Sequence, residues 1–206
     1  MLYNIVMLLS AGVSLLGALV FLFVFWKRLK EDYAVEMIFE TCFYVLLAIL
    51  IGWLISLKFS PEYFLWAVFA SSILGLYIGV LRFKLRFYEA LETLVIASLP
   101  WLSFIFLKDS VVNSSLSSFI GFLVILIIIF AFYFLDTHYR EFTWYKSGKV
   151  GFAGLSTLAI IFAIRTATFL AGIRMLSYLY HYEAILSGFM ILISLVLLWN
   201  LSHKIS

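Results

Sequence analysis

Seven long apolar stretches constrain the fold of this chain more than any other feature. A helix that crosses the hydrocarbon core of a bilayer needs about 20 mostly apolar residues. Stretches that approach or exceed this length run approximately over residues 3–26, 38–57, 63–81, 88–107, 119–135, 151–173 and 183–201. The fifth, with FLVILIIIFAFYFL, is the most uniformly apolar, whereas Glu89, Glu92 and Pro100 interrupt the fourth. The sequence therefore predicts an all-α polytopic membrane protein with seven transmembrane helices.

The composition excludes several other classes of protein. Only 12% of the 206 residues are charged, about half the share that covers the surface of a soluble domain. With two prolines and no glycine- or serine-rich linker, residues 1–206 are expected to form a single membrane domain. The basic residues form short clusters between the apolar stretches, which does not favour nucleic acid as a partner. No pair among His138, His181 and His203 has metal-ligand spacing, so no metal is expected, and no cofactor is expected either.

The distribution of positive charge predicts the orientation in the membrane. Loops after the first, third and fifth stretches, together with the C-terminal tail, hold ten basic residues: Lys27, Arg28, Lys30, Arg82, Lys84, Arg86, Arg140, Lys146, Lys149 and Lys204. The other loops hold three: Lys58, Lys108 and Arg174. Because cytoplasmic loops carry the excess of lysine and arginine, the N-terminus is expected outside and the C-terminus in the cytoplasm.

One charged residue, Arg165, lies inside the sixth stretch, in AIIFAIRTATFLAG. It follows Gly151 by fourteen residues, or about 21 Å of helix, which places it in the outer half of a core roughly 30 Å thick. A charge at that depth costs about 2.5–3.5 kcal/mol and normally faces protein, water or a partner. Arg165 therefore has one of two roles. It either stabilises the packing of helices by pairing with carbonyls or with a carboxylate, or it binds a lipid phosphate, to which a guanidinium donates two hydrogen bonds. Thr166 and Thr168 could share such a ligand, although threonine in a membrane helix often bonds its own backbone.

The carboxylates in the sequence are interpreted as poor partners for Arg165. Glu40, Glu89, Glu92 and Asp136 fall near the predicted cytoplasmic ends of their stretches, and Asp109 is taken as the carboxylate on the outer side. This distribution favours an external anion.

The charges near the cytoplasmic side are interpreted as exposed to solvent. Glu89 and Glu92 lie three residues apart, so they share one helix face, and three basic residues precede them, at 82, 84 and 86. The spacing predicts a solvated charge cluster at the membrane interface. WKRLKED, which begins at Trp26, is similarly expected to form a mixed-charge cytoplasmic turn.

Three segments carry a resemblance to a known family. IGWLISLKFSPEYFL resembles the end of the family's second helix and its following turn, and FASSILGLYIG resembles a helix-three motif, with Phe69, Ile73 and Gly75 in register. SGKVGFAGLSTLAIIFAIRTATF resembles its glycine-led sixth helix, where Arg165 falls on the family's arginine. The chain thus resembles the prolipoprotein diacylglyceryl transferases. The resemblance implies a bacterial inner-membrane protein that takes phosphatidylglycerol-type lipid and transfers its diacylglyceryl group to the lipobox cysteine of a preprotein.

The family's polar signature is largely replaced in this chain. Its helix-three histidine aligns with Ala70 and its two glycines with Ser71 and Ser72, so the resemblance implies that these residues and Phe69 line the pocket. The tyrosine four residues before the arginine and the glutamate four after it align with Ile161 and Phe169. The family's arginine-x-glycine-asparagine motif has no counterpart, since FLKDSVVN stands there. The catalytic residues therefore stay unassigned, and Arg165 is the residue carried over.

Three functions remain open at this point. The chain is either a divergent transferase that acts on lipid, a non-catalytic lipid-binding or scaffold protein, or a small transporter subunit. A transporter would be expected to contain broken helices or paired charges within the membrane.

Overall fold

The computed structural model describes residues 2–142, 150–172 and 182–203, and most of them lie in seven long helices. These are α1 (Leu2–Leu29), α2 (Val35–Phe59), α3 (Phe64–Phe83), α4 (Phe87–Asn113), α5 (Leu116–His138), α6 (Phe152–Leu170) and α7 (Glu183–His203). Two single 3₁₀ turns, η1 (Pro61–Tyr63) and η2 (Tyr139–Glu141), complete the elements of the described part, which contains no strand. All seven long helices are long and apolar enough to cross a membrane. The prediction of an all-α, seven-helix membrane protein is confirmed.

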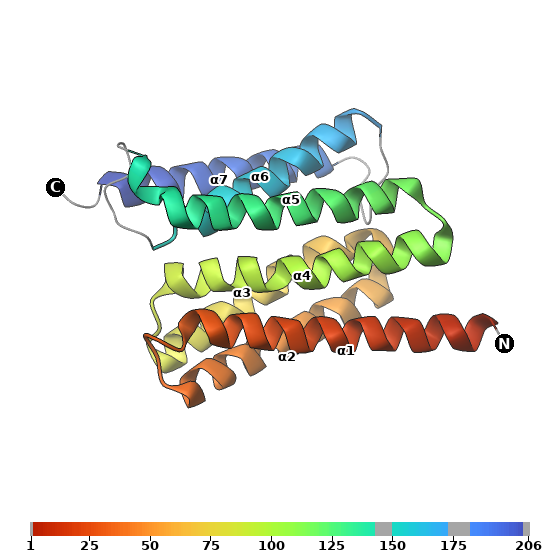
Figure 1. Cartoon of the computed structure of the whole chain (residues 1–206), viewed down its shortest axis with the longest axis horizontal. Helices are drawn as coiled ribbons and strands as arrows, with labels where there is room; N and C mark the ends of the chain where they lie inside the picture. The colour runs from red at the N-terminus through yellow and green to blue at the C-terminus, as the bar shows by residue number, and fades with distance from the viewer. Residues whose placement is uncertain (1, 143–149, 173–181, 204–206) are drawn as a thin grey trace.

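The helices lie side by side and alternate in direction, so that the two termini lie at opposite ends of the bundle (Figure 1). α2 packs chiefly on α3, α1 on α4, and α6 on α7, while α4 also contacts α5, α6 and α3. α4 is the central helix, because 61% of its apolar window is buried against 17–39% in the other six helices. Because α4 contacts α1, α3, α5 and α6, polar side chains on α4 can meet those of several other helices inside the protein.

α4 is continuous through the residues that interrupt the fourth apolar stretch. Glu92 is buried and bonded within the bundle, and the Ser103 hydroxyl donates to the carbonyl of Pro100 over 2.7 Å. A proline inside a helix removes one backbone hydrogen bond, but packing on several sides holds α4 in place. A helix that faces other helices needs less apolar character than one that faces lipid.

Small residues let α2 and α3 approach closely. A Cβ atom added at Gly75 would lie 2.8 Å from the carbonyl oxygen of Tyr44, and one at Gly79 would lie 2.7 Å from a methyl carbon of Thr41. Gly75 and Gly79 are four residues apart, the spacing that allows close backbone packing between membrane helices. The two helices therefore form a tight pair beside the central helix.

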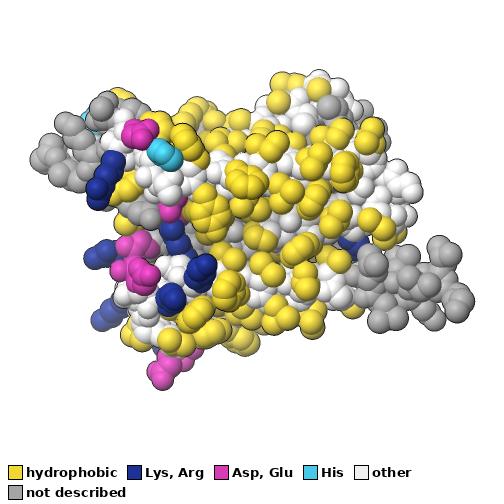
Figure 2. Space-filling model, in the orientation of Figure 1, with side chains coloured by type: hydrophobic (Ala, Val, Ile, Leu, Met, Phe, Trp, Pro, Cys, Tyr) yellow, Lys and Arg dark blue, Asp and Glu magenta, His cyan; other side chains and the backbone are white. Residues whose placement is uncertain are grey.

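Charged side chains gather at one end of the molecule, whereas hydrophobic side chains cover most of the remaining surface in this view (Figure 2). We call this the charged end: α1, α3, α5 and α7 finish there, and α2, α4 and α6 begin there. Seven of the ten basic residues assigned to the cytoplasm lie in its described segments: Lys27, Arg28, Lys30, Arg82, Lys84, Arg86 and Arg140. Lys146, Lys149, Lys204 and, from the smaller set, Arg174 lie outside the described residues.

The charge count predicts that the charged end faces the cytoplasm. An alkaline phosphatase reporter, which is active only outside the cytoplasm, is expected to be silent when fused to the C-terminus and active when inserted after Ser60, between α2 and η1. A fluorescent protein that matures in the cytoplasm serves as the reciprocal control and is expected to be bright at the C-terminus. The opposite pattern of activities would overturn the predicted orientation.

Candidate functional site

Arg165 lies near the end of α6 and forms a buried ion pair with α7. Its Nε donates to Oε1 of Glu183 over 2.7 Å, and its Nη2 lies 2.6 Å from the same oxygen. Arg165 is 9% exposed and Glu183 is fully buried. Since α6 ends at Leu170, the guanidinium lies within the last turns of the helix, at the end of the bundle opposite the charged end.

Glu183 connects three helices through its two carboxylate oxygens. The indole Nε1 of Trp66, on α3, donates to Oε2 over 3.0 Å, and the Ser187 hydroxyl donates to Oε1 over 3.0 Å. We call Trp66, Arg165, Glu183 and Ser187 the Arg165 cluster. Hydrogen bonds to an ionised carboxylate are stronger than those between neutral groups, so the cluster joins α3, α6 and α7 at a single buried carboxylate.

Aromatic rings enclose the Arg165 cluster on the side of α3. Phe162, one turn before Arg165, is stacked with Trp66 at 5.5 Å between ring centroids and meets Phe69 edge-on at 5.3 Å. Phe162 is buried, as are both residues of the ion pair, so the pair lies in an apolar interior. A low-polarity surrounding strengthens the attraction between the two charges and raises the cost of separating them.

The interpretation that Arg165 lacks a carboxylate at its own level is wrong. Glu183, rather than Asp109, is the carboxylate that pairs with Arg165. Asp109 instead accepts from the side chains of Asn113 and Ser118 at the turn between α4 and α5. Glu183 could have been found, because it opens the last apolar stretch and the same charge count places that position on the outer side.

The hydroxyls of Thr166 and Thr168 are bonded within α6. Thr166 donates to the carbonyl of Phe162 over 2.9 Å, and Thr168 donates to the carbonyl of Ile164 over 2.8 Å. This is the backbone bonding that threonine often adopts in membrane helices. In the structure the two hydroxyls therefore support the helix beside Arg165.

The helix-three residues assigned to the pocket are distributed over different surroundings. Phe69 joins the rings beside the Arg165 cluster, whereas Ala70 is exposed. Ser71 donates to the carbonyl of Val68 and faces Gly52 of α2, and buried Ser72 donates to the carbonyl of Phe69. Of these four residues, the structure brings Phe69 toward Arg165.

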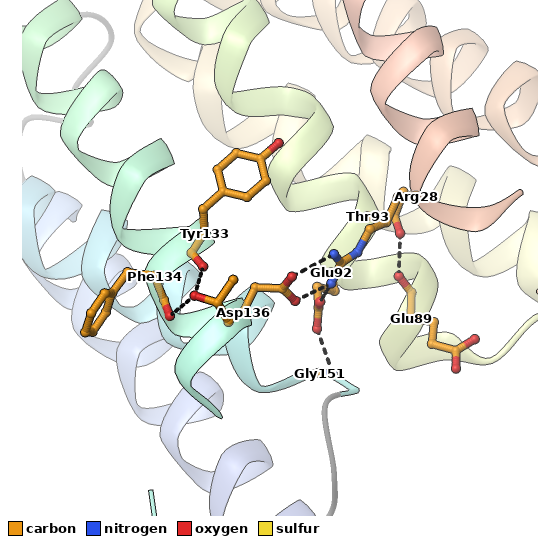
Figure 3. A network of polar contacts seen from close by, with 9 residues as sticks. Arg28, Glu89, Glu92, Thr93, Tyr133, Phe134, Asp136 and Gly151 are labelled. Atoms are coloured by element: carbon orange, nitrogen blue, oxygen red, sulfur yellow. Dashed lines mark hydrogen bonds and ion pairs between the residues drawn. The ribbon is translucent and has the colours of Figure 1, made fainter. Parts of the chain in front are cut away.

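A second polar cluster lies at the charged end (Figure 3). Arg28, in the last turn of α1, bonds Asp136 of α5 through Nη1 at 3.0 Å and Nη2 at 2.5 Å, and Nη2 also donates to Oε1 of Glu92 on α4. The backbone N–H of Gly151 donates to Oε2 of Glu92 over 2.8 Å. We call Arg28, Glu92, Asp136 and Gly151 the Arg28 cluster. It joins α1, α4, α5 and the start of α6.

Two buried carboxylates share one guanidinium in the Arg28 cluster. The side chains of Glu92 and Asp136 are 4% and 7% exposed, and that of Arg28 is 26% exposed. The ring of Phe132 lies beneath the guanidinium, 5.8 Å away. The N–H of Gly151 belongs to the positive end of α6, which also favours an anion. The guanidinium of Arg28 and the N–H of Gly151 therefore stabilise the two buried carboxylates.

Two glycines allow α6 to reach Glu92. Gly151 has φ +84°, a backbone conformation that favours glycine. A Cβ atom added at Gly154 would lie 2.7 Å from the Cα of Glu92. The glycines that lead the sixth helix thus have a physical role, since they let the start of α6 dock on a charged residue of α4.

The interpretation of the inner charges as solvated is wrong for Arg28 and Glu92, which face one another inside the bundle. It fits Arg86, whose side chain is 76% exposed, better than Glu89, whose side chain is 14% exposed; the two form an ion pair at 3.0 Å. Tyr33, between α1 and α2, donates to Glu89 over 2.5 Å, and partial burial together with this hydrogen bond raises the pKa of the Tyr33 phenol. Helical spacing placed Glu89 and Glu92 near one another but did not show which one turns inward.

In the part of the chain that the structure describes, no group of three or more histidine, cysteine or carboxylate residues could hold a metal ion. In both clusters the charged groups are one guanidinium and the carboxylates that pair with it. No protein-family model matches the chain, and no curated protein or solved structure matches it either.

Proposed function

We propose that this protein is a divergent relative of the prolipoprotein diacylglyceryl transferases that handles phosphatidylglycerol-type lipid at the Arg165 cluster. The observation that carries this proposal is that the helix-three and helix-six segments with the resemblance meet there, through Phe69 and Phe162. The family has a glutamate four residues after its arginine, at the position of Phe169 in this chain. Glu183 supports the proposal because it supplies Arg165 with a carboxylate from α7 instead.

The proposed lipid contact is an exchange of anions on Arg165. A guanidinium binds a phosphate at two points, as it binds a carboxylate. Without lipid, Glu183 holds the guanidinium and keeps a nearly neutral pair inside the protein. A lipid phosphate would compete with Glu183 for this position, so that binding the headgroup releases the carboxylate.

The released carboxylate suggests how transfer would proceed. Glu183 would take the proton from an acceptor thiol, and the thiolate would attack the diacylglyceryl carbon that carries the phosphate oxygen. The carbon–oxygen bond would break, and the glycerol phosphate would leave on Arg165, whose charge stabilises it. The acceptor that the resemblance implies is the lipobox cysteine of a preprotein.

The transporter alternative receives mixed support. The charges of both clusters are paired inside the bundle, which is one property expected of a transporter. However, each of the seven long helices in the described ranges is continuous. Lipid handling therefore remains the proposed function.

Replacing Glu183 by glutamine tests the exchange of anions. The substitution removes the charge that competes with phosphate, so the affinity of Glu183→Gln for phosphatidylglycerol is expected to rise by about tenfold over that of the wild type. Affinity is measured in detergent from the lipid-dependent rise in unfolding temperature, with phosphatidylcholine as the reference lipid. Transfer of diacylglycerol from labelled phosphatidylglycerol to a lipobox peptide is expected for the wild type and lost in the variant.

Asp109→Asn is the matched control, because Asp109 is a carboxylate at the same end of the bundle and outside the Arg165 cluster. It is expected to leave the affinity for phosphatidylglycerol unchanged. Equal affinity of the wild type and Glu183→Gln would contradict the exchange. Selective binding by the wild type without transfer would replace the transferase by the non-catalytic alternative.

A further inference from the structure

Glu40 is a carboxylate on the outer surface of α2, at the charged end. It is exposed, and it makes no hydrogen bond or ion pair with the described residues. Its neighbours Phe39 and Phe43 are 45% and 63% exposed. Together with Tyr44 these residues line a shallow pocket of about 300 Å³. We call it the Glu40 pocket.

If the hydrocarbon core is centred on α2, the helix dimensions put the Glu40 pocket near the boundary between hydrocarbon and headgroups. α2 has 25 residues, or about 38 Å of helix, and therefore exceeds a core of roughly 30 Å by about 4 Å at each end. Glu40 follows the first residue of α2 by five positions, or about 7.5 Å, so its Cα lies about 4 Å inside the core. Side chains lean toward the N-terminus of their helix, and this directs the carboxylate of Glu40 back toward the headgroups.

A comparison with Glu92 shows what the Glu40 pocket lacks. Both glutamates lie five residues after the first residue of their helices, Val35 and Phe87. Glu92 faces the interior and meets Arg28 and the N–H of Gly151. Glu40 is exposed and has no such partner among the described residues. A cation that meets Glu40 would therefore come from outside the protein, and at the level of the headgroups zwitterionic lipids carry one.

The surroundings of Glu40 match a zwitterionic headgroup. Aromatic rings attract an ammonium group through their faces, and a carboxylate accepts hydrogen bonds from a primary ammonium, which has three donors. On the other side of the pocket, Tyr44 lies 6.2 Å from Phe83 between ring centroids. Phe83 lies between Arg82 and Lys84 in the sequence, so the basic end of α3 is next to the pocket.

We propose that the Glu40 pocket binds the headgroup of phosphatidylethanolamine, with its ammonium on Glu40 and its phosphate toward Arg82 and Lys84. Phosphatidylcholine fits less well because its quaternary ammonium has no N–H donor, and phosphatidylglycerol has no cation. The pocket is at the opposite end of the bundle from the Arg165 cluster, so this proposal does not depend on the proposed function.

The experiment counts lipids bound to the full chain by native mass spectrometry. Purified protein in detergent is titrated with dioleoyl phosphatidylethanolamine, phosphatidylcholine or phosphatidylglycerol. One phosphatidylethanolamine is expected to bind more tightly than phosphatidylcholine, and Glu40→Gln is expected to weaken this binding by about tenfold. Phe43→Ala is expected to weaken it about threefold, because it removes one aromatic wall. Glu31→Gln, an exposed carboxylate at the same end, is expected to leave it unchanged.

Glu40 and Phe43 are exposed, so both variants are expected to keep the unfolding temperature of the wild type in lipid-free detergent. Equal binding of phosphatidylethanolamine by the wild type and these two variants would overturn the proposal, as would equal binding of phosphatidylcholine. A dimer of the chain that Glu40→Gln dissociates would also overturn it, because a second copy would then occupy the pocket. Unchanged phosphatidylglycerol binding by Glu40→Gln supports separate sites.

Discussion

Replacing Arg28 by methionine is expected to lower the free energy of unfolding by about 3–5 kcal/mol. Methionine keeps an unbranched apolar side chain but has no charge, so Glu92 and Asp136 would stay buried without their shared cation. Breaking a buried pair from one side is more destabilising than removing the whole pair. Because the cluster joins α1 to α4, α5 and α6, we expect the loss to affect the packing of the central helix.

Stability is measured by reversible unfolding in mixed detergent micelles, followed by circular dichroism. Arg86→Met is the matched control: Arg86 is 76% exposed, and Glu89 keeps its hydrogen bond from Tyr33, so stability is expected to change little. Adding Glu92→Gln and Asp136→Asn to the Arg28→Met chain is expected to recover part of the loss, because these changes remove the orphaned charges. If Arg28→Met and Arg86→Met had equal stability, the Arg28 cluster would not hold the helices together.

Replacing Arg165 by leucine is expected to lower the free energy of unfolding by a similar amount, about 3–5 kcal/mol. The substitution leaves the fully buried carboxylate of Glu183 without its guanidinium. Had Arg165 bound only an external anion, leucine would have preserved or raised stability by deleting a costly charge. The ion pair with Glu183 therefore reverses the direction expected for a lone arginine.

The double variant Arg165→Leu, Glu183→Leu separates pairing from other effects of the substitution. It is expected to recover most of the lost stability, because apolar residues that replace both partners of a buried pair are often neutral or stabilising. Neither variant is expected to gain stability from phosphatidylglycerol, since both lack the guanidinium. Measurement of unfolding with and without that lipid checks both expectations, and a lipid-dependent rise in either variant would place the phosphate site elsewhere.

The number and approximate positions of the helices followed from the sequence. A run such as that of α5 has one low-energy solution in lipid, a helix that satisfies its own backbone. The predicted stretch 151–173 differs from α6 (Phe152–Leu170) by a few residues, and α4 is longer than the predicted stretch 88–107. Hydropathy identifies the part of a helix that faces lipid, so it is least informative for α4, whose surroundings are mostly other helices.

The partners of the buried charges could not be obtained from the same reasoning. Arg165 and Glu183 are 18 residues apart, Arg28 and Glu92 are 64 apart, and Arg28 and Asp136 are 108 apart. Helical periodicity relates residues within a few turns, and the charge count assigns an end of the bundle but not a face of a helix. Small residues such as Gly75 and Gly154 determine which faces approach closely.

The sequence by itself therefore determined the seven long apolar helices found in the described residues, and that charges concentrate at alternate loops, because hydropathy and charge act locally along the chain. Only the tertiary structure decided that Arg165 is half of an ion pair, and that Glu92 turns inward while Glu40 is exposed. Both glutamates have the same local position in their helices. What differs is the neighbouring helix, and in lipid a buried charge is stable only where packing brings an opposite charge or a hydrogen-bond donor within reach.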